Sequence, residues 1–144
     1  MDEAAKKAIL RSFPYGLYVV TVTHNGEDHG MTANWITQAA FEPPMVVVAI
    51  ENTSKTIGMI RDSHHFAINL LLKGQRDLAG KLGRSSDQSP QKLKGIKTKP
   101  APVSGVPVLG ETGMPAGINR AGLTDPGGLV AAHPTGSRAG DAAR

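Results

Sequence analysis

The stretch between residues 29 and 56 constrains the fold more than any other part of this chain. It begins with a run of small hydroxyl and amide residues at 29–38, continues through six apolar residues at 45–50, and closes on a hydroxyl-rich run at 52–56. An apolar run this short, bounded by prolines and an asparagine, predicts a strand that is buried on both faces and central to its sheet. The hydroxyl-rich run predicts the start of a helix. Together these segments are typical of a site for a flat ligand with a phosphate tail.

Patterns elsewhere predict an antiparallel β structure with helices. Asn25 and Gly26 both accept the positive φ angles of a tight hairpin turn, so the strands on either side should pair. Asp2 can cap a first helix, and Gly83 is expected at the C′ position of the last one. The expected strands cover residues 17–23, 29–34, 38–41, 45–50 and 66–72, and the expected helices cover residues 3–12, 54–63 and 75–82. The pattern favours an antiparallel barrel or sheet whose gaps are filled by helices.

The last third of the chain differs from the rest in composition. It contains six of the ten prolines, many glycines and few periodic apolar residues. Such a segment buries too little apolar surface to offset the loss of chain entropy. The sequence therefore predicts one domain over residues 1–109 and an irregular or disordered Gly/Pro/Ala-rich tail over residues 110–144.

Composition excludes several kinds of chemistry. The chain has no cysteine, so it has no disulfide, no thiolate metal ligand and no cysteine nucleophile. Its first residues are acidic instead of basic and apolar, and no apolar run approaches the length of a membrane span. These features predict a cytoplasmic protein with no membrane partner.

The net charge of +4 is unevenly placed. Eight acidic and eight basic residues cancel over residues 1–83, and the excess arises after them, largely in a segment that holds Lys92, Lys94, Lys97 and Lys99. Lysines at near-alternate positions between prolines and serines are typical of a solvated loop, and no aromatic side chain lies among them to stack on bases. We therefore expect no nucleic-acid partner. A fragment that associates with nucleic acid through this segment stays open as an alternative.

The hydroxyl-rich run at 53–56 is a candidate anion site. The first turn of a helix offers free backbone N–H groups and the positive end of the helix dipole. The hydroxyls of Ser54 and Thr56 and the ammonium of Lys55 would add donors to it. The alternative is ordinary capping, in which Thr53 or Ser54 satisfies only its own helix.

The run before the apolar strand is a candidate site for the ring of the same ligand. Small side chains at Thr32 and Ala33 let backbone amides approach a flat ring, and Asn34 offers both a donor and an acceptor. Thr37 adds a hydroxyl. The alternative is a polar strand edge in which Trp35 fills the core.

No catalytic constellation is visible. His64 and His65 would point to opposite faces of a strand, and no group of carboxylates accompanies the histidines, so we expect no metal site. The chain lacks Gly-x-Ser-x-Gly and the Rossmann Gly-x-Gly-x-x-Gly. A nicotinamide would therefore have to bind transiently, without a domain of its own.

The order of these motifs resembles the flavin reductase-like proteins of the FMN-binding split-barrel class. The resemblance covers residues 8–109 and is strongest over residues 13–83. It implies an antiparallel split β-barrel that binds FMN, with FAD possible, and that transfers hydride from NAD(P)H to the flavin. It also implies a homodimer and a partner monooxygenase that receives reduced flavin. The cofactor accepts the hydride in such chemistry, so the absence of a catalytic side chain agrees with it.

The resemblance also implies roles for particular residues. Asn52, Ser54 and Thr56 match positions that commonly hold the FMN phosphate, and main-chain groups of residues 32–35 match those that reach the polar edge of the isoalloxazine. The full set of expected cofactor-binding residues is Thr32, Ala33, Asn34, Trp35, Thr37, Glu51, Asn52, Ser54, Lys55, Thr56 and Lys81.

The chain departs from the family pattern after Leu109. Family members usually continue with two or three further strands, where this chain has a tail rich in glycine, proline and alanine. The switch resembles a reading-frame shift or a truncation, and it predicts an unclosed barrel with exposed strand edges. A non-catalytic FMN-binding or electron-carrier protein, which would keep the phosphate and ring contacts but lack a productive nicotinamide position, is the other alternative.

Overall fold

The computed structural model describes residues 2–42, 44–110, 115–124 and 129–134 of the chain. Its helices are α1 (Glu3–Arg11), α2 (Lys55–Ser63) and α3 (Arg76–Leu82). Its strands are β1 (Tyr18–His24), β2 (Glu27–Ala33), β3 (Ile36–Phe41), β4 (Pro44–Ala49), β5 (Phe66–Leu70), β6 (Thr98–Pro100), β7 (Pro107–Leu109), β8 (Pro115–Thr124) and β9 (Leu129–Pro134). Within these ranges, no helix is both long and apolar enough to cross a membrane.

Seven of the strands form one antiparallel sheet. The strand order is β2-β1-β5-β8-β9-β4-β3, and β6 and β7 form a separate two-stranded sheet. The hairpin of β1 and β2 pairs Thr23 with Asp28 and His24 with Glu27 across the predicted turn. Asn25 and Gly26 have φ angles of 50° and 75°, which is the positive-φ geometry that this turn requires. The predicted antiparallel β architecture with helices is therefore confirmed.

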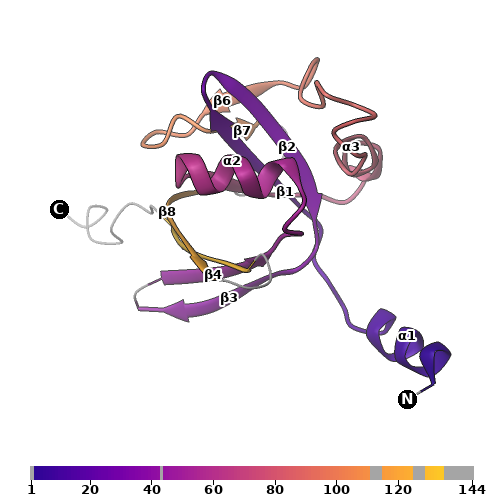
Figure 1. Cartoon of the computed structure of the whole chain (residues 1–144). Helices are drawn as coiled ribbons and strands as arrows, with labels where there is room; N and C mark the ends of the chain where they lie inside the picture. The colour runs from indigo at the N-terminus through magenta and orange to yellow at the C-terminus, as the bar shows by residue number, and fades with distance from the viewer. Residues whose placement is uncertain (1, 43, 111–114, 125–128, 135–144) are drawn as a thin grey trace.

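The main core lies inside the curve of the seven-stranded sheet. Figure 1 shows α2 lying between the half of the sheet formed by β1 and β2 and the half formed by β3 and β4. Ile57 and Ile60 of α2 pack there with Val20 of β1, Val48 of β4 and Phe66 of β5, each 1% exposed or less. Burial of these side chains fixes α2 against the sheet. It thereby also fixes the position of the residues at the start of α2.

The predicted helix starts and ends agree closely with the structure. Asp2 caps α1 by accepting from the backbone N–H groups of Ala4 and Ala5, and Ser54 caps α2. Gly83 does end α3, but in the right-handed helical region at φ −80° instead of the expected left-handed one. A Cβ at this glycine would lie 3.1 Å from the carbonyl oxygen of Ala79, so close approach of the backbone is what favours glycine here.

Strand β4 is less central than its sequence predicts. It is second from one edge of the sheet, and Val48 is the one residue of β4 among the buried hydrophobics. The apolar run that does lie deep in the sheet is β5, whose first four residues are all buried. Val47 and Ala49, which alternate with Val48 along the strand, line a cavity together with Trp35, and the run of apolar residues alone could not reveal this.

Two segments of the predicted irregular tail are strands in the structure. β8 pairs with β5, β9 pairs with β4, and the two pair with each other, so they join the two halves of the sheet. Main-chain hydrogen bonds form this ladder, and residues of almost any type can supply them beside an apolar neighbour strand. One edge of β4 and one edge of β5 are paired in this way. Residues 111–114, 125–128 and 135–144 of the predicted tail lie outside the described residues.

A chain that ends after Gly110 is expected to aggregate or fail to fold. It would leave one edge of β4 and one edge of β5 unpaired in the middle of the sheet. Unpaired strand edges can pair with strands of other molecules, which leads to aggregation. Solubility and far-ultraviolet circular dichroism of the shortened chain test this. A soluble, cooperatively folded product of residues 1–110 would instead support the separate tail that the sequence predicts.

Candidate functional site

The start of α2 carries the predicted anion-binding residues. Ser54 is the N-cap, and its Oγ accepts a hydrogen bond of 3.2 Å from the backbone N–H of Ile57. Accepting this bond leaves the hydroxyl proton of Ser54 available to a further acceptor. Thr56 is 1% exposed, and no acidic residue occupies the first turn. The helix start therefore keeps its positive potential, and capping by Ser54 is compatible with anion binding.

A cavity of about 730 Å³ opens at this helix start. We refer to it as the α2 cavity. Its walls come from β2, from the start of α2, from the end of α3 and from the turn that follows α3. The lining residues are Met31, Thr32, Glu51, Thr53, Ser54, Lys55, Thr56, Leu82, Gly83, Arg84, Ser85, Ser86, Asp87 and Lys92. Hydroxyl donors and cations outnumber the two carboxylates, and such a set suits a phosphate.

Two titratable groups are buried beside the α2 cavity. Lys92 is 5% exposed and His29 is 1% exposed. The His29 Nε2 lies 3.5 Å from the Ser86 hydroxyl, while the His29 Nδ1 has no hydrogen-bond partner. Burial first, and then the charges of Lys92 and Lys55, lower the pKa of His29 from 6.5 to about 4. His29 is therefore neutral near pH 7 and adds no second positive charge beside Lys92.

Lys55 and Thr32 line the α2 cavity but also have partners within the fold. The Nζ of Lys55 donates to a carboxylate oxygen of Glu27, and this pairing lowers the pKa of Glu27. The hydroxyl of Thr32 donates to the carbonyl of Ala79 over 2.6 Å, which ties β2 to α3. These contacts hold the cavity walls together.

The predicted site is divided among several places in the structure. Thr32, Glu51, Ser54, Lys55 and Thr56 line the α2 cavity. Asn34, Trp35 and Thr37 line a second cavity of about 380 Å³, together with Pro14, Tyr15 and residues of β3 and β4. Ala33 is a buried core residue, and the side-chain oxygen of Asn52 accepts from Arg61 over 3.2 Å. In the part of the chain that the structure describes, no three His, Asp or Glu side chains are grouped as metal ligands.

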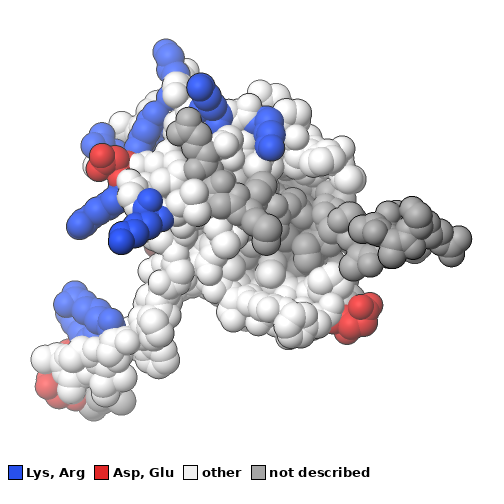
Figure 2. Space-filling model, turned by 180° about the vertical axis from the view of Figure 1, so that it is seen from behind, with Lys and Arg blue, Asp and Glu red and all other residues white. Residues whose placement is uncertain are grey.

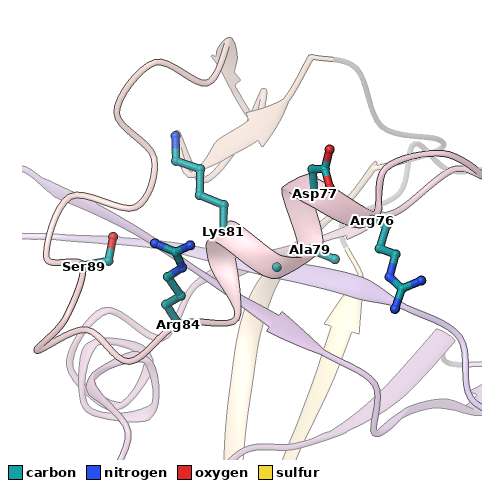
Figure 3. A pocket seen from close by; sticks show the side chains of 7 residues that line it. Arg76, Asp77, Ala79, Lys81, Arg84 and Ser89 are labelled. Atoms are coloured by element: carbon teal, nitrogen blue, oxygen red, sulfur yellow. The ribbon is translucent and has the colours of Figure 1, made fainter.

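Lys81 lies in a third cavity, which is formed by one side of α3 and the loop that follows it. This cavity measures about 860 Å³, and Arg84 lines both it and the α2 cavity. In Figure 3 the side chains of Lys81 and Arg84 extend toward the loop that carries Ser89, whereas Arg76 points away from them. The Nζ of Lys81 donates to the backbone carbonyl of Lys94 over 2.7 Å. Lys81 thus braces the loop, and Arg84 is the basic residue that connects the two cavities.

The sequence analysis missed residues 82–87 and Lys92 as lining residues. Its interpretation of the lysine-rich segment as a solvated loop holds for Lys94, Lys97 and Lys99, which are exposed, but not for Lys92. The signal that was present is the run Arg84-Ser85-Ser86, a cation followed by two hydroxyls at a helix end. Figure 2 shows that Lys and Arg side chains gather over the region of α3 and the loop after it.

Residues 10–118 match the flavin reductase like domain. The chain therefore belongs to this family. The matched range contains every residue that lines the α2 cavity.

Curated relatives match a shorter part of the chain. The chain is 34% identical over 79 residues to the reductase component of 4-nitrophenol 4-monooxygenase/4-nitrocatechol 2-monooxygenase from Rhodococcus opacus. The aligned segment covers 55% of this chain and 43% of that protein. The chain is 35% identical over 82 residues to an NADH:FMN oxidoreductase of Rhodococcus erythropolis, which covers 57% of this chain and 43% of that protein. The chain thus spans less than half the length of these two relatives.

Solved structures share the fold over nearly the whole chain. The NADH:FAD oxidoreductase of Streptomyces globisporus C-1027 superposes with a TM-score of 0.79 and 22% identity, covering 94% of this chain and 81% of that one. The flavin reductase PheA2 superposes with a TM-score of 0.78 and 23% identity, covering 94% of this chain and 86% of that one. At such identities the likeness concerns the fold alone.

The free energy of unfolding is expected to fall on acidification through the titration of His29. Its folded pKa of about 4 lies below the ordinary 6.5, so the unfolded chain takes up a proton first as the pH drops. Stability from neutral His29 is complete above pH 6.5 and is lost as the pH falls toward 4, by up to about 3 kcal/mol. Denaturant unfolding at several pH values, compared with His29→Gln, isolates this contribution. Parallel pH profiles for the two proteins would contradict it.

Proposed function

We propose that this chain binds FMN with its phosphate in the α2 cavity and transfers hydride from NAD(P)H to the bound flavin. The observation that carries the proposal is the donor-lined cavity at the start of α2. Family membership and the names of the Rhodococcus relatives support the same activity. The name of the Rhodococcus erythropolis relative favours FMN over FAD.

The donor set fits a phosphate group. The hydroxyls of Ser54 and Thr56 and the first backbone N–H groups of α2 lie at one wall, and Arg84 and Lys92 lie at the others. A phosphate monoester is a small dianion that accepts several charge-assisted hydrogen bonds at once. Helix starts bind such groups because the dipole and the free N–H groups act together.

The ring site follows from the position of β2. This strand is at one end of the sheet order, so among the described strands none pairs with the main-chain groups on its outer edge. Thr32 lines the α2 cavity and Asn34 lines the second cavity, about 7 Å further along the chain. A ligand with its phosphate at α2 can therefore lay its ring along the end of β2. Asn34 and Trp35 are exposed, which leaves the ring region open to a nicotinamide.

The flavin, when bound, supplies the hydride-accepting chemistry, and the protein supplies binding and orientation. The α2 cavity anchors the phosphate, and the end of β2 offers donors and acceptors to the ring edge. Holding both ends of the ligand fixes the ring for an approaching nicotinamide, which lowers the entropic part of the barrier. No acid or base from the chain is needed in this scheme.

The proposal includes a homodimer and a partner monooxygenase. The name of the Rhodococcus opacus relative, a reductase component, supports the partner. The dimer is supported by α1, which extends away from the body in Figure 1 and has no buried residue. Leu10 and Phe13 are 52% and 57% exposed, and Trp35 is 60% exposed. Large apolar side chains left exposed on and beside a helix with no buried residue are typical of an interaction surface.

Introducing charge on this surface is expected to shift a dimer to a monomer. Leu10→Asp with Phe13→Asp places two carboxylates where apolar surface would otherwise be buried, so the dimer should weaken by at least about 3 kcal/mol. Light scattering over a range of concentrations measures the change, with Arg11→Glu on the same helix as the control. A wild-type protein that is monomeric and still binds and reduces flavin would contradict the proposed dimer.

Titration of the purified chain with FMN and with riboflavin tests the proposal directly. Because the account depends on the phosphate, FMN should bind at least about a hundredfold more tightly than riboflavin. Equal affinities would contradict the placement of a phosphate in the α2 cavity. A non-catalytic flavin carrier would show the same preference but would not oxidise NAD(P)H. Salt-dependent binding to nonspecific DNA without flavin binding would favour the nucleic-acid alternative.

A further inference from the structure

Lys92 is unusual among the cations of the described residues because it is buried. It is 5% exposed, and it is the one buried Lys or Arg among residues 2–42 and 44–110. Its Nζ donates to the carbonyl of Leu82 over 3.3 Å, and Lys92 is one of the residues that line the α2 cavity. A lysine ammonium has three protons to donate, so this contact does not use its full capacity.

The charge of Lys92 has no counter-charge within the described residues. The carboxylates of Glu51 and Asp87 line the same cavity, yet neither forms an ion pair with Lys92. The other buried neighbour, His29, is neutral near pH 7 and has an unpartnered Nδ1. Burial lowers the pKa of Lys92, which reflects the cost of holding this charge away from water. A buried cation without an anion is destabilising unless a ligand supplies one.

We infer that Lys92 is the buried counter-charge for the phosphate of the bound flavin and that it makes the site selective for phosphorylated flavin. This inference rests on the proposed function. Ser54 and Thr56 approach the cavity from the helix start, and Lys92 approaches it from the loop after α3. A phosphate between them neutralises the charge of the buried ammonium. It also accepts hydrogen bonds from the ammonium N–H groups that do not donate to the Leu82 carbonyl.

A purely structural role for Lys92 is the main competitor. Leu82 is the last residue of α3, and a cation near the carboxyl end of a helix is favourable. The two roles predict opposite effects on the ligand-free protein. Removing a helix cap lowers the melting temperature of the apoprotein, whereas removing an uncompensated buried charge leaves it unchanged or raises it.

The test uses two variants. Lys92→Met keeps the apolar stem of the side chain. Lys92→Gln keeps a donor for the Leu82 carbonyl, so it is expected to fold even if the methionine variant does not. The control is Lys94→Met, which removes an exposed lysine two positions away. Fluorescence titration gives the dissociation constants for FMN and riboflavin, and thermal unfolding is followed with and without FMN. We expect FMN affinity to fall at least about tenfold in both Lys92 variants, with riboflavin affinity changed less than about twofold. The Lys94 variant should match the wild type.

Two results would overturn the inference while leaving the proposed function intact. One is an FMN affinity that is unchanged in both Lys92 variants. The other is an equal loss of FMN and riboflavin affinity together with a lower apoprotein melting temperature, which indicates helix capping. Failure of the proposed function looks different, because the wild-type protein itself would then bind FMN no better than riboflavin, and that result overturns the inference as well.

Discussion

Replacing Ser54 by alanine together with Thr56 by valine is expected to weaken FMN binding by about 3 to 6 kcal/mol. Both residues line the α2 cavity, and each hydroxyl should donate to an anionic oxygen of the phosphate. The charge on that acceptor is what makes each lost bond costly. Thr56→Val preserves the shape of a side chain that is 1% exposed, so the change is confined to the hydroxyl. Fluorescence titration with FMN measures the effect.

Riboflavin provides the control for this double substitution because it has the ring but no phosphate. Ser54 also caps α2 through the N–H of Ile57, so some loss of helix stability, about 1 kcal/mol, is expected for both ligands alike. The difference between the two ligands removes that common part. Equal losses for FMN and riboflavin would mean that the hydroxyls only cap the helix.

Asn69→Leu is expected to lower the free energy of unfolding by about 3 to 5 kcal/mol. Asn69 is fully buried in β5 and joins three elements. Its Nδ2 donates to the carbonyl of Val19 over 3.1 Å and to the hydroxyl of Thr21 over 3.2 Å, and its Oδ1 accepts from the backbone N–H of Leu109 over 2.9 Å. Leucine has a similar size but can make none of these three hydrogen bonds in the buried interior. Urea unfolding gives the free-energy change.

The control for Asn69 is an exposed asparagine. Asn52→Ala removes a hydrogen bond to Arg61 at the surface, where water replaces it, so the expected loss is under about 1 kcal/mol. A loss for Asn69→Leu no larger than that for Asn52→Ala would show that the link from β1 and β5 to β7 contributes little to stability.

Features of the fold that depend on neighbouring residues in the sequence could be predicted well. Asp2 and Ser54 are caps because their side chains reach backbone groups two or three residues away. Asn25 and Gly26 define their turn by their own backbone preferences. Pairing of β8 and β9 with β5 and β4 depends on residues far apart in the chain, and a segment rich in small residues gives no local sign of it.

The candidate site could be predicted only in part for the same reason. The hydroxyls at the start of α2 follow from a local motif, and they do line a cavity. The split between the cavity of Thr32 and that of Asn34 depends on which faces of β2 and β3 are covered. Lys92 was predicted to be solvated because it belongs to a run of lysines at near-alternate positions. Its burial results from the docking of a loop on elements that are distant in the sequence. No spacing in the sequence reports such docking.

The central claim is that the chain holds a flavin which a reduced nicotinamide can reduce. The most direct test mixes the purified protein, loaded with FMN, with NADH or NADPH in the absence of oxygen. The account predicts that the yellow absorbance of the bound flavin disappears with at least one of the two nicotinamides and returns when oxygen is admitted. Bound FMN that stays oxidised with both nicotinamides would contradict the account and leave a flavin-binding protein without reductase activity.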